Sequence, residues 1–456
     1  MANKQMVRVA NGQGFWGDSL LGPLRLVDEG PIDYLTLDYL SEVTMSIMQK
    51  LKSRDPNAGY ATDFVQLLAR ILPKIKAKGI KVVANAAGVN GRACLAAIKK
   101  VAAEQGIKGL RVGIIEGDDI FADVDRLMAG GEAFKNMDGG GPLSKVRDRL
   151  TSANVYIGAK PIADALDQGA DIVVAGRITD PSLALGPLIH EFGWSMTDYD
   201  LLARGTVAGH IMECGAQCTG GNFSRWREVP NFAHIGYPVS EVHPDGSFVV
   251  TKHEGTGGLV TVDTVSSQLL YEMGDPHHYL GPDCTVDFTT LKIAQDGENR
   301  VRISDVKGSA PTDTYKVSMT YADGYKIASG IVVTGPDAVE RARLCADIVF
   351  ERLAMHGAPV APENRFVEIF GTNVCYKGIV AEPKDPGEVL LRIGARGPDR
   401  KKLDILGREM APLVTSGPPG LTGFAAGRAR ATEVFGYWPA LMDKTKISTR
   451  VTVEEV

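Results

Sequence analysis

The stretch HIMECGAQCTGGNF, residues 210–223, holds the densest group of side chains in this sequence that could do chemistry. His210, Glu213, Cys214 and Cys218 fall close together, and two glycines follow. If the stretch is helical, His210, Cys214 and Cys218 share one face, because residues four apart are neighbours on a helix. The residue types fit a metal site, a redox pair, a thiol or carboxylate catalyst, or only a buried element that runs into a turn.

The cysteine spacing argues against a metal site and against disulfide exchange. Structural zinc sites usually combine two pairs of ligands, and the remaining cysteines are scattered through the chain in apolar or isolated settings. Cys214 and Cys218 also lack the two-residue spacing of dithiol oxidoreductases. We therefore predict no tightly bound metal.

The carboxyl group beside a thiol is better suited to catalysis than the two cysteines are to metal binding or disulfide exchange. A poorly solvated Glu213 would have a raised pKa and could act as a general acid or base. Cys214 could act as a nucleophile only if a neighbour lowered its pKa, and either His210 or His253 could reach it in space. Glu213, Cys214 and His210 are the candidate catalytic residues. The alternative is a structural element, since free cysteine is among the most buried residue types.

The elements that must position these residues alternate between strands and helices in the first half of the chain. Short β-branched runs are separated by amphipathic patterns such as residues 64–79 and 91–106. This alternation predicts an α/β domain with a mostly parallel, doubly wound sheet. We place this domain at residues 1–205, with residues 206–227 as a connecting segment.

The second half of the chain changes character at about residue 228. Alternating strands with hairpin turns come first, and strand–helix–strand units follow, with helices expected over residues 337–357 and 399–417. This order predicts an α+β domain over residues 228–456 with a ferredoxin-like split βαβ pattern. The loop at residues 414–430 is rich in glycine and proline, and loops of that length are often functional.

Polar residues follow the predicted strands of the first domain. Ligands of open parallel sheets bind beyond the carboxyl ends of the strands, so these residues are candidates for substrate binding: Gly14, Trp16, Asp18, Asp38, Asn85, Glu116, Arg177 and Asp180. Helix capping is the alternative for most of them. Arg177 is a poor cap but a good bidentate clamp for a carboxylate or phosphate. We expect these strand-end residues to line one cleft.

Two further glycine turns could hold an anion with backbone N–H groups. They extend the candidate substrate-binding set to Gly220, Gly221, Asn222, Lys252, Glu254 and Gly257. We expect the stretch 210–223 to close over the strand-end cleft, with the backbone of residues 220–222 presenting donors to the substrate.

A glycine motif follows the first strand, with Gly12, Gly14 and Gly17 in the G-x-G-x-x-G spacing. Alone it is a weak dinucleotide signal. Phe15 and Trp16 lie inside it, and the segment that follows is a poor glycine-packed helix. We predict no cofactor.

Composition narrows the functional class. The chain has 456 residues, 44% of them hydrophobic and 23% charged, with a net charge of −5. This charge does not favour nucleic acid or an anionic membrane, and no apolar run approaches the roughly 20 residues of a membrane helix. The start lacks the apolar core of a signal peptide. We expect a cytoplasmic homo-oligomer with reduced thiols that binds a small-molecule carboxylate or an acyl-CoA.

Several motifs together resemble one known family, that of acyclic terpene utilisation protein A. They are GFWGD, LDYLSEVTMS, ANAAGVN, VAGRITDPSLALGPLIHEFGW, GHIMECGAQCTGGNF, KHEGTGGLVTVDTVSSQLLYEMGDPHHYLGPDCTVDF and SGPPGLTGFAAGR, in order from about residue 8 to the C-terminus. The resemblance implies a soluble bacterial protein of acyclic terpenoid catabolism, in which branched acids are carried as CoA thioesters. It assigns no catalytic residue.

We expect a lyase or hydratase that acts on a carboxylated or branched acyl-CoA, or on a hydroxy-polycarboxylic acid. The alternatives are a non-catalytic subunit that binds acyl-CoA or a carboxylate, and a hydrolase that uses Cys214 as its nucleophile.

Overall fold

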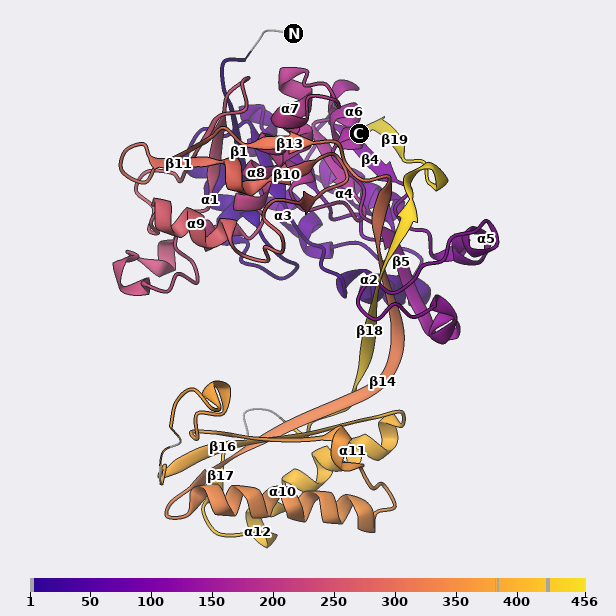
Figure 1. Cartoon of the computed structure of the whole chain (residues 1–456), viewed down its shortest axis with the longest axis vertical. Coiled ribbons are helices and arrows are strands. Elements are labelled where there is room, and N and C mark those ends of the chain that lie inside the picture. Colours follow the sequence, from indigo (N-terminus) through magenta and orange to yellow (C-terminus); the bar gives the residue numbers. More distant parts are fainter. Residues whose placement is uncertain (1–3, 382, 384, 424–426) are drawn as a thin grey trace. The chain divides into compact units, whose positions relative to one another are not determined.

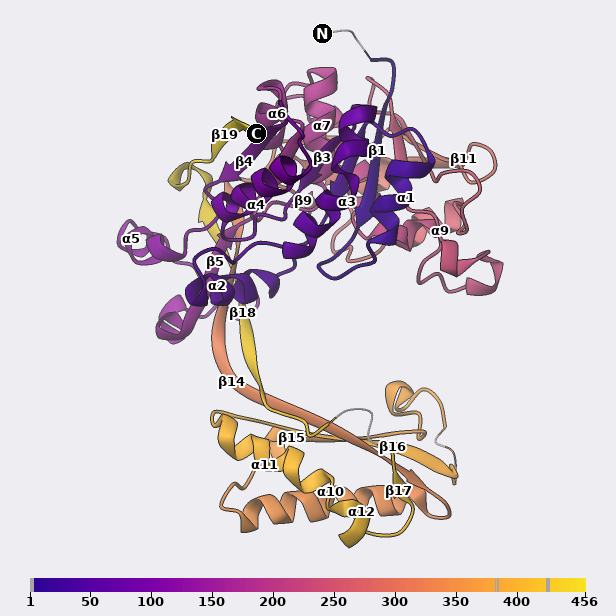
Figure 2. The same ribbon diagram turned by 180° about the vertical axis from the view of Figure 1, so that it is seen from behind.

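The computed structural model describes residues 4–381, 383, 385–423 and 427–456. The mixed α/β chain forms two compact units (Figures 1 and 2), unit 1 with residues 1–320 and 437–456, and unit 2 with residues 321–436. These boundaries differ from the predicted ones, because the segment 206–227 lies within unit 1. The physical reason is that strands from both halves of the sequence join one sheet.

The core of unit 1 is a ten-stranded sheet in the order β11-β12-β8-β7-β1-β2-β3-β6-β4-β19. Its strands are β1 (Val7–Gln13), β2 (Tyr34–Leu37), β3 (Lys81–Ala84), β4 (Arg111–Glu116), β6 (Ile172–Ala175), β7 (Val239–Val242), β8 (Phe248–Thr251), β11 (Lys292–Gln295), β12 (Val301–Ser304) and β19 (Arg450–Glu455). The neighbours from β1 to β4 in this order pair in parallel. The flanking strands pair antiparallel, including β19 against β4.

Helices cover both faces of this sheet. They are α1 (Leu21–Glu29), α2 (Thr44–Arg54), α3 (Thr62–Lys78), α4 (Gly91–Glu104), α6 (Lys160–Asp167), α7 (Ser182–Phe192) and α8 (Tyr199–Met212). One buried cluster of hydrophobic residues joins the sheet to α1–α4, and a second joins it to α6–α8. The central strands are apolar along their length because both of their faces are buried; β6, for example, is fully buried.

The remaining elements of unit 1 lie around this layered core. They are α5 (Val124–Ala129), β5 (Leu150–Val155), α9 (Val262–Leu269), β9 (Tyr279–Leu280), β10 (Thr285–Asp287) and β13 (Lys307–Ser309). Strands β13, β10 and β9 form a small separate sheet. Helix α9 begins with a capping box at Thr261, directly after the glycine turn that the sequence predicts there.

Unit 2 is built on the strand order β15-β16-β14-β17. Its elements are β14 (Thr314–Thr334), α10 (Ala338–Met355), β15 (Arg365–Phe370), β16 (Glu388–Gly397), α11 (Arg400–Met410), α12 (Leu413–Ser416), β17 (Leu421–Thr422) and β18 (Thr432–Asp443). The three helices lie on one side of the strands (Figures 1 and 2). Apolar residues of α10 and α11 pack there against alternate residues of β14 and β16.

The long strand β14 lies in the part of the chain where the sequence predicts alternating strands with hairpin turns. It runs without a turn through 21 residues, past Gly324, and pairs with β16 from Tyr325 to Thr334. Both β14 and β18 continue across the boundary between the units. Each unit is therefore joined to the other by two chain crossings.

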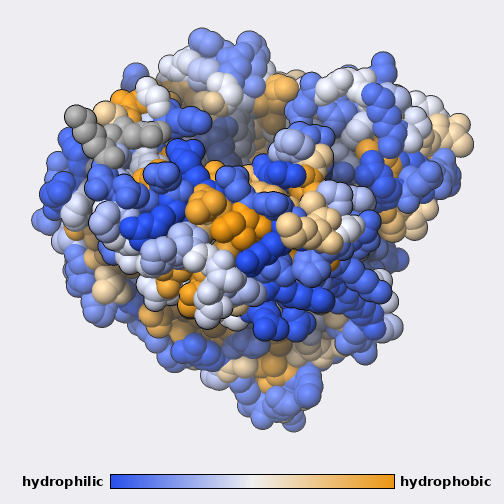
Figure 3. Space-filling model, turned by 90° about the horizontal axis from the view of Figure 1, so that it is seen from below, coloured by the Kyte–Doolittle hydropathy of each residue, from blue (hydrophilic) through white to orange (hydrophobic). Residues whose placement is uncertain are grey.

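The exposed surface is mixed in character. On the face shown in Figure 3, hydrophobic side chains appear in small groups among hydrophilic ones. The exposed large hydrophobic residues of unit 2 include Leu344, Met355 and Val414. Within the described ranges, every helix is too short or too polar to cross a membrane.

Helix α8 fits closely against the start of α7. A Cβ atom added at Gly209 would lie 2.5 Å from the carbonyl oxygen of Pro181 and 2.6 Å from its Cα, both of them backbone atoms. We expect Gly209→Ala to lower the free energy of unfolding by about 1–3 kcal/mol, although alanine favours a helix by roughly 1 kcal/mol. The urea midpoint of unfolding measures this. Gly274→Ala is the control, because a Cβ there meets nothing within 4 Å. Equal midpoints for the two variants would contradict the close fit.

Candidate functional site

The stretch 210–223 lies against the carboxyl end of β1. Helix α8 ends at Met212, Glu213 caps it, and a 3-10 turn follows over Gly215–Thr219. The Asn11 side-chain amide donates to the carbonyls of Met212, at 2.6 Å, and Glu213, at 3.1 Å. A Cβ atom added at Gly14 would lie 2.9 Å from the carbonyl carbon of Cys214. Gly14 therefore allows the loop after β1 to touch the backbone at Glu213 and Cys214.

His210 and Glu213 form a buried pair. Nδ1 of His210 lies 3.1 Å from Oε1 of Glu213, and Nε2 lies 3.3 Å from the carbonyl oxygen of Leu269. The exposed fraction of the side chain is 1% for His210 and 10% for Glu213. Because a carbonyl only accepts, Nε2 carries a hydrogen in either charge state. The contact at Nδ1 therefore holds one proton, on the imidazole or on the carboxyl group.

Burial shifts the titration of this pair. Loss of water raises the pKa of Glu213, which the His210 charge opposes and the negative charge of Asp180 reinforces. Burial alone would lower the pKa of His210, but the adjacent Glu213 raises it above its ordinary value. The pair thus keeps its shared proton to a higher pH than an isolated histidine would. A carboxyl group in this state is suited to proton transfer.

Asp38 and Asn85 meet at the ends of β2 and β3. The Asn85 amide donates to Oδ1 of Asp38 at 2.7 Å, and its own oxygen accepts from the backbone N–H of Tyr39 at 2.7 Å. Asp38 also shares a side-chain hydrogen bond with Asp180. Two carboxyl groups can share a hydrogen bond only when one of them is protonated, and burial raises the pKa of both.

Arg177 is the buried centre of this cluster, with 2% of its side chain exposed. Its Nη2 donates to Asp180 at 2.9 Å, its Nη1 donates to the carbonyl of Leu40, and the guanidinium lies 4.2 Å from the centroid of the Tyr156 ring. Both Nη groups, which the sequence predicted to bind a substrate carboxylate, therefore already donate to oxygen atoms of the protein. Asp180 keeps 33% of its side chain exposed.

At the end of β4, the structure brings Asp118 rather than Glu116 into the cluster. Oδ2 of Asp118 accepts from the Arg177 backbone N–H at 2.8 Å and from the Asn154 amide at 3.1 Å. Glu116 instead forms surface ion pairs with Arg92 and Arg450. The expectation that Glu116 lines the same cleft is thus replaced by a surface role, because the antiparallel strand β19 covers that position.

The loop after β1 is anchored by Asp18 and Trp16. Asp18 accepts from the backbone N–H of Gly14 at 3.0 Å and hydrogen-bonds the hydroxyl of Tyr237. Trp16 hydrogen-bonds Asp63 in the first turn of α3. Trp16 therefore connects the loop to helix α3. Gly14 and Asp18 lie next to the stretch 210–223.

The paired glycines serve the turn rather than a ligand. The N–H groups of Gly220 and Gly221 donate to the carbonyls of Gln217, at 3.3 Å, and Ala216, at 2.9 Å. Gly220 has φ +104°, a conformation that favours glycine. The expectation that these two donors face the substrate was wrong. Asn222 is exposed, with φ +57°.

The second glycine turn lies in a separate groove of about 670 Å³ on unit 1. Lys252 and Glu254 line this groove, where the Lys252 ammonium donates to the carbonyl of Thr256 at 2.8 Å. Gly257 donates its N–H to the backbone carbonyl of His234 at 2.8 Å. A Cβ atom added at Gly257 would lie 2.1 Å from the carbonyl oxygen of Asn231. Lys252 and Gly257 thus hold the turn together, whereas Glu254 is exposed on the groove. The hydrogen bonds of Lys252 and Gly257 are to residues of the turn and of the neighbouring loop and not to Arg177 or Glu213.

The thiols of the stretch are not activated. Burial raises the pKa of Cys214 to about 12, and Glu213 adds to the shift. Cys218 is fully buried, and burial raises its pKa as well. Among the residues described, no group of three or more His, Cys, Asp or Glu side chains is placed to hold a metal ion.

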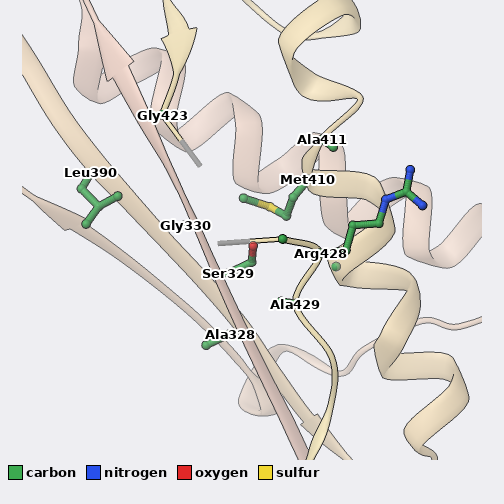
Figure 4. Close-up of a pocket in the computed structure, with 11 residues that line it drawn as sticks. Ala328, Ser329, Gly330, Leu390, Met410, Ala411, Gly423, Arg428 and Ala429 are labelled. Carbon is green, nitrogen blue, oxygen red and sulfur yellow. The ribbon is translucent and has the colours of Figure 1, made fainter. Parts of the chain in front are cut away.

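The predicted functional loop at residues 414–430 borders a cavity in unit 2. This cavity measures about 540 Å³ and is lined mainly by small residues of β14, α11 and the loop. Figure 4 shows Met410 reaching from its helix toward β14. Residues 424–426 of the loop lie outside the described residues.

We use the name strand-end site for the residues that converge on the carboxyl ends of the parallel strands. They are Gly14, Asp18, Asp38, Asn85, Asp118, Arg177, Asp180, His210 and Glu213. Sequence reasoning missed Asn11, Glu42 and Tyr156. The Tyr156 hydroxyl donates to Glu42 at 3.0 Å beneath the guanidinium. Neither residue ends a strand of the parallel sheet, so no strand-end signal marks it.

Comparison with known proteins identifies one family. The sequence model for "Acyclic terpene utilisation family protein AtuA" matches residues 7–453. No curated protein and no solved structure matches the chain.

The buried carboxyl group of Asp118 makes stability depend on pH. Burial raises its pKa from 3.8 to about 7. The folded state therefore holds this proton more tightly than the unfolded state, and the resulting stabilisation is lost as pH rises from about 4 to 7. A shift of this size corresponds to roughly 4 kcal/mol. We expect Asp118→Asn to flatten the decline in the free energy of unfolding across this range.

Urea unfolding at a series of pH values measures this decline. The exposed Asp138→Asn is the matched control, and its curve should run parallel to that of the wild type. If the free energy of unfolding of Asp118→Asn declines with pH as steeply as that of the wild type, Asp118 does not cause the decline.

Proposed function

Because the chain belongs to the acyclic terpene utilisation AtuA family, which implies a role in acyclic terpene utilisation, we propose that it is an enzyme of that process. The proposed reaction is that of a lyase or hydratase. The substrate is a branched or carboxylated acyl-CoA, or a hydroxy-polycarboxylic acid. The location proposed is the cytoplasm, which the six free cysteines support, since disulfides are rare in a reducing compartment.

One observation carries the proposal, the buried pair of His210 and Glu213 beside the strand ends. Oε1 of Glu213 contacts His210, whereas Oε2 is buried without a hydrogen-bond partner. A pure binding protein has little need for a carboxyl group with a raised pKa and a free oxygen. Perturbed groups of this kind concentrate at catalytic sites.

The pair fits the proton transfers of reversible hydration. In the hydration direction, the Glu213 carboxylate takes a proton from water while the water oxygen bonds to the β-carbon of an unsaturated acyl group. The α-carbon then takes a proton from an acid such as the Asp38–Asp180 pair, where burial raises the pKa of both carboxyl groups and so favours a protonated form. One water is added across the double bond, and dehydration is the reverse. His210 stabilises whichever charge Glu213 carries.

We also propose a specific fold for each of the two units. Five neighbouring parallel strands with helices on both faces support a doubly wound domain. In unit 2, the order β15-β16-β14-β17, with a helix after β14 and another after β16, supports a ferredoxin-like split βαβ domain.

The test compares two Glu→Gln variants. We expect Glu213→Gln to lower turnover by roughly 10²–10⁴, the usual range for a positioned acid–base group, because an amide cannot take up the proton. The matched control is Glu228→Gln, an exposed carboxylate that pairs with Arg225. Turnover is followed by mass spectrometry, as gain or loss of one water by branched unsaturated and hydroxylated acyl-CoA thioesters. Full activity in folded Glu213→Gln would exclude the proposed role.

A second variant separates the proposal from a thiol-dependent hydrolase. The raised pKa of Cys214 keeps the group as a thiol, so Cys214→Ser should retain turnover within about tenfold, far from the near-complete loss expected for a nucleophile. The measurement is the same water-addition assay, with thioester hydrolysis followed in parallel. Hydrolysis by the wild type that disappears in Cys214→Ser would favour the hydrolase.

A further inference from the structure

Several buried polar atoms without hydrogen-bond partners belong to the strand-end site or to Gln13, the residue before Gly14 of that site. They include Oε1 of Gln13, Oε2 of Glu213 and Nε of Arg177. Gln13 and Arg177 are almost fully buried, at 0% and 2% exposure, and the Glu213 side chain is nine-tenths buried. Buried polar groups are normally paired by protein, water or ligand. The three residues end β1, follow β6 and cap α8, and a ligand at the strand ends would supply the missing partners.

Two of these atoms are acceptors beside the end of β1. Gln13 is the last residue of β1, and its carbonyl oxygen accepts from the Asp38 backbone N–H at 3.0 Å. Its side-chain nitrogen donates to the carbonyl of Phe15 at 3.0 Å, which leaves Oε1 free. Glu213 is held against the same strand by Asn11. The free oxygens of Gln13 and Glu213 both need a donor.

The donors of the site are already engaged. Both Nη groups of Arg177 donate to protein oxygens, and the amides of Asn85 and Asn154 donate to Asp38 and Asp118. The one buried donor without a partner among these groups is Nε of Arg177. The site therefore offers a ligand more acceptors than donors.

The charges around the site are mainly negative. The carboxyl groups are those of Asp18, Asp38, Glu42, Asp118, Asp180 and Glu213. The cationic groups that face them are Arg177, His210 and Lys316, the last of which lies 4.8 Å from the Tyr156 ring centroid. Asp38 and Asp180 hydrogen-bond each other, and burial raises the pKa of both carboxyl groups. A further carboxylate here would meet like charges.

We propose that the part of the substrate in the strand-end site is a neutral, hydroxyl-bearing acyl group, and that the site rejects a carboxylate in that position. A hydroxyl can donate to Oε2 of Glu213 and accept from a donor such as Nε of Arg177, whereas a carboxylate only accepts. The inference rests on the proposed function and narrows its substrate class to hydroxyacyl thioesters and the alkenes that correspond to them.

The test uses three CoA thioesters with four-carbon acyl groups that differ in one feature. They are butyryl-CoA, 3-hydroxybutyryl-CoA and succinyl-CoA, and their dissociation constants are measured by calorimetry with the full chain at neutral pH. We expect 3-hydroxybutyryl-CoA to bind at least about tenfold more tightly than butyryl-CoA, and succinyl-CoA to bind more weakly than butyryl-CoA. A tenfold preference corresponds to about 1.4 kcal/mol.

Two variants locate the preference. Glu213→Met removes the free oxygen at similar side-chain length, so it should bind butyryl-CoA and 3-hydroxybutyryl-CoA equally. Glu228→Met is the matched control and should keep the wild-type preference. Where Glu213→Met does not fold, by circular dichroism, Gln13→Met takes its place and should reduce the preference.

The outcomes separate this inference from the proposed function. Succinyl-CoA binding as tightly as 3-hydroxybutyryl-CoA, no gain from the hydroxyl, or no binding of any of the three overturns the inference. Hydroxyl preference without water addition to any substrate supports the inference and overturns the proposed function. Water addition to a carboxylate-bearing substrate without any preference for the hydroxyl supports the proposed function and overturns the inference.

Discussion

The buried guanidinium of Arg177 is the interaction on which the strand-end site depends. The guanidinium donates to Asp180 and to the backbone carbonyl of Leu40, and the backbone N–H of Arg177 donates to Asp118. In this way it connects segments that follow β2, β4 and β6. Removing a buried charge partner usually costs more than the pair contributes. The carboxyl groups of Asp38, Asp118 and Asp180 are tolerated together because the Arg177 side chain supplies a positive charge and because burial raises the pKa of all three.

The strand-end residues that could be predicted from the sequence are those governed by a local rule. Asp38, Asn85 and Arg177 each follow a short apolar strand, and parallel pairing places those strand ends side by side. The rule fails at β4, where Glu116 and Asp118 both follow the apolar run. Only the antiparallel strand β19, more than 300 residues later in the chain, decides that Glu116 faces Arg450 at the surface. Such long-range pairing has no local signature.

The fold shows the same division between local and distant information. The alternation of strands and helices in the first half could be predicted, because each strand is a short apolar run that is visible in the local sequence. The domain boundary could not be predicted in this way, because β7 and β8 look like strands of a second domain. Only the pairing of β7 with β1, and of β8 with β7, places them in the sheet of unit 1. The glycines at 220 and 221 show a related limit. A glycine pair indicates an unusual backbone, but whether its N–H groups face a ligand or close a turn depends on carbonyls such as that of Ala216.

Unit 2 occupies a single continuous stretch of chain between two segments of unit 1. Strand β19, at the edge of the large sheet, comes from the second of those segments. During synthesis, residues 321–436 leave the ribosome before β19 does, so the inserted unit has all of its strands and helices while the sheet of unit 1 still lacks an edge. The unpaired side of β4 must stay unpaired over that interval, and an exposed strand edge is a site where chains associate. The apolar strand β4 thus links the order of synthesis to the risk of aggregation.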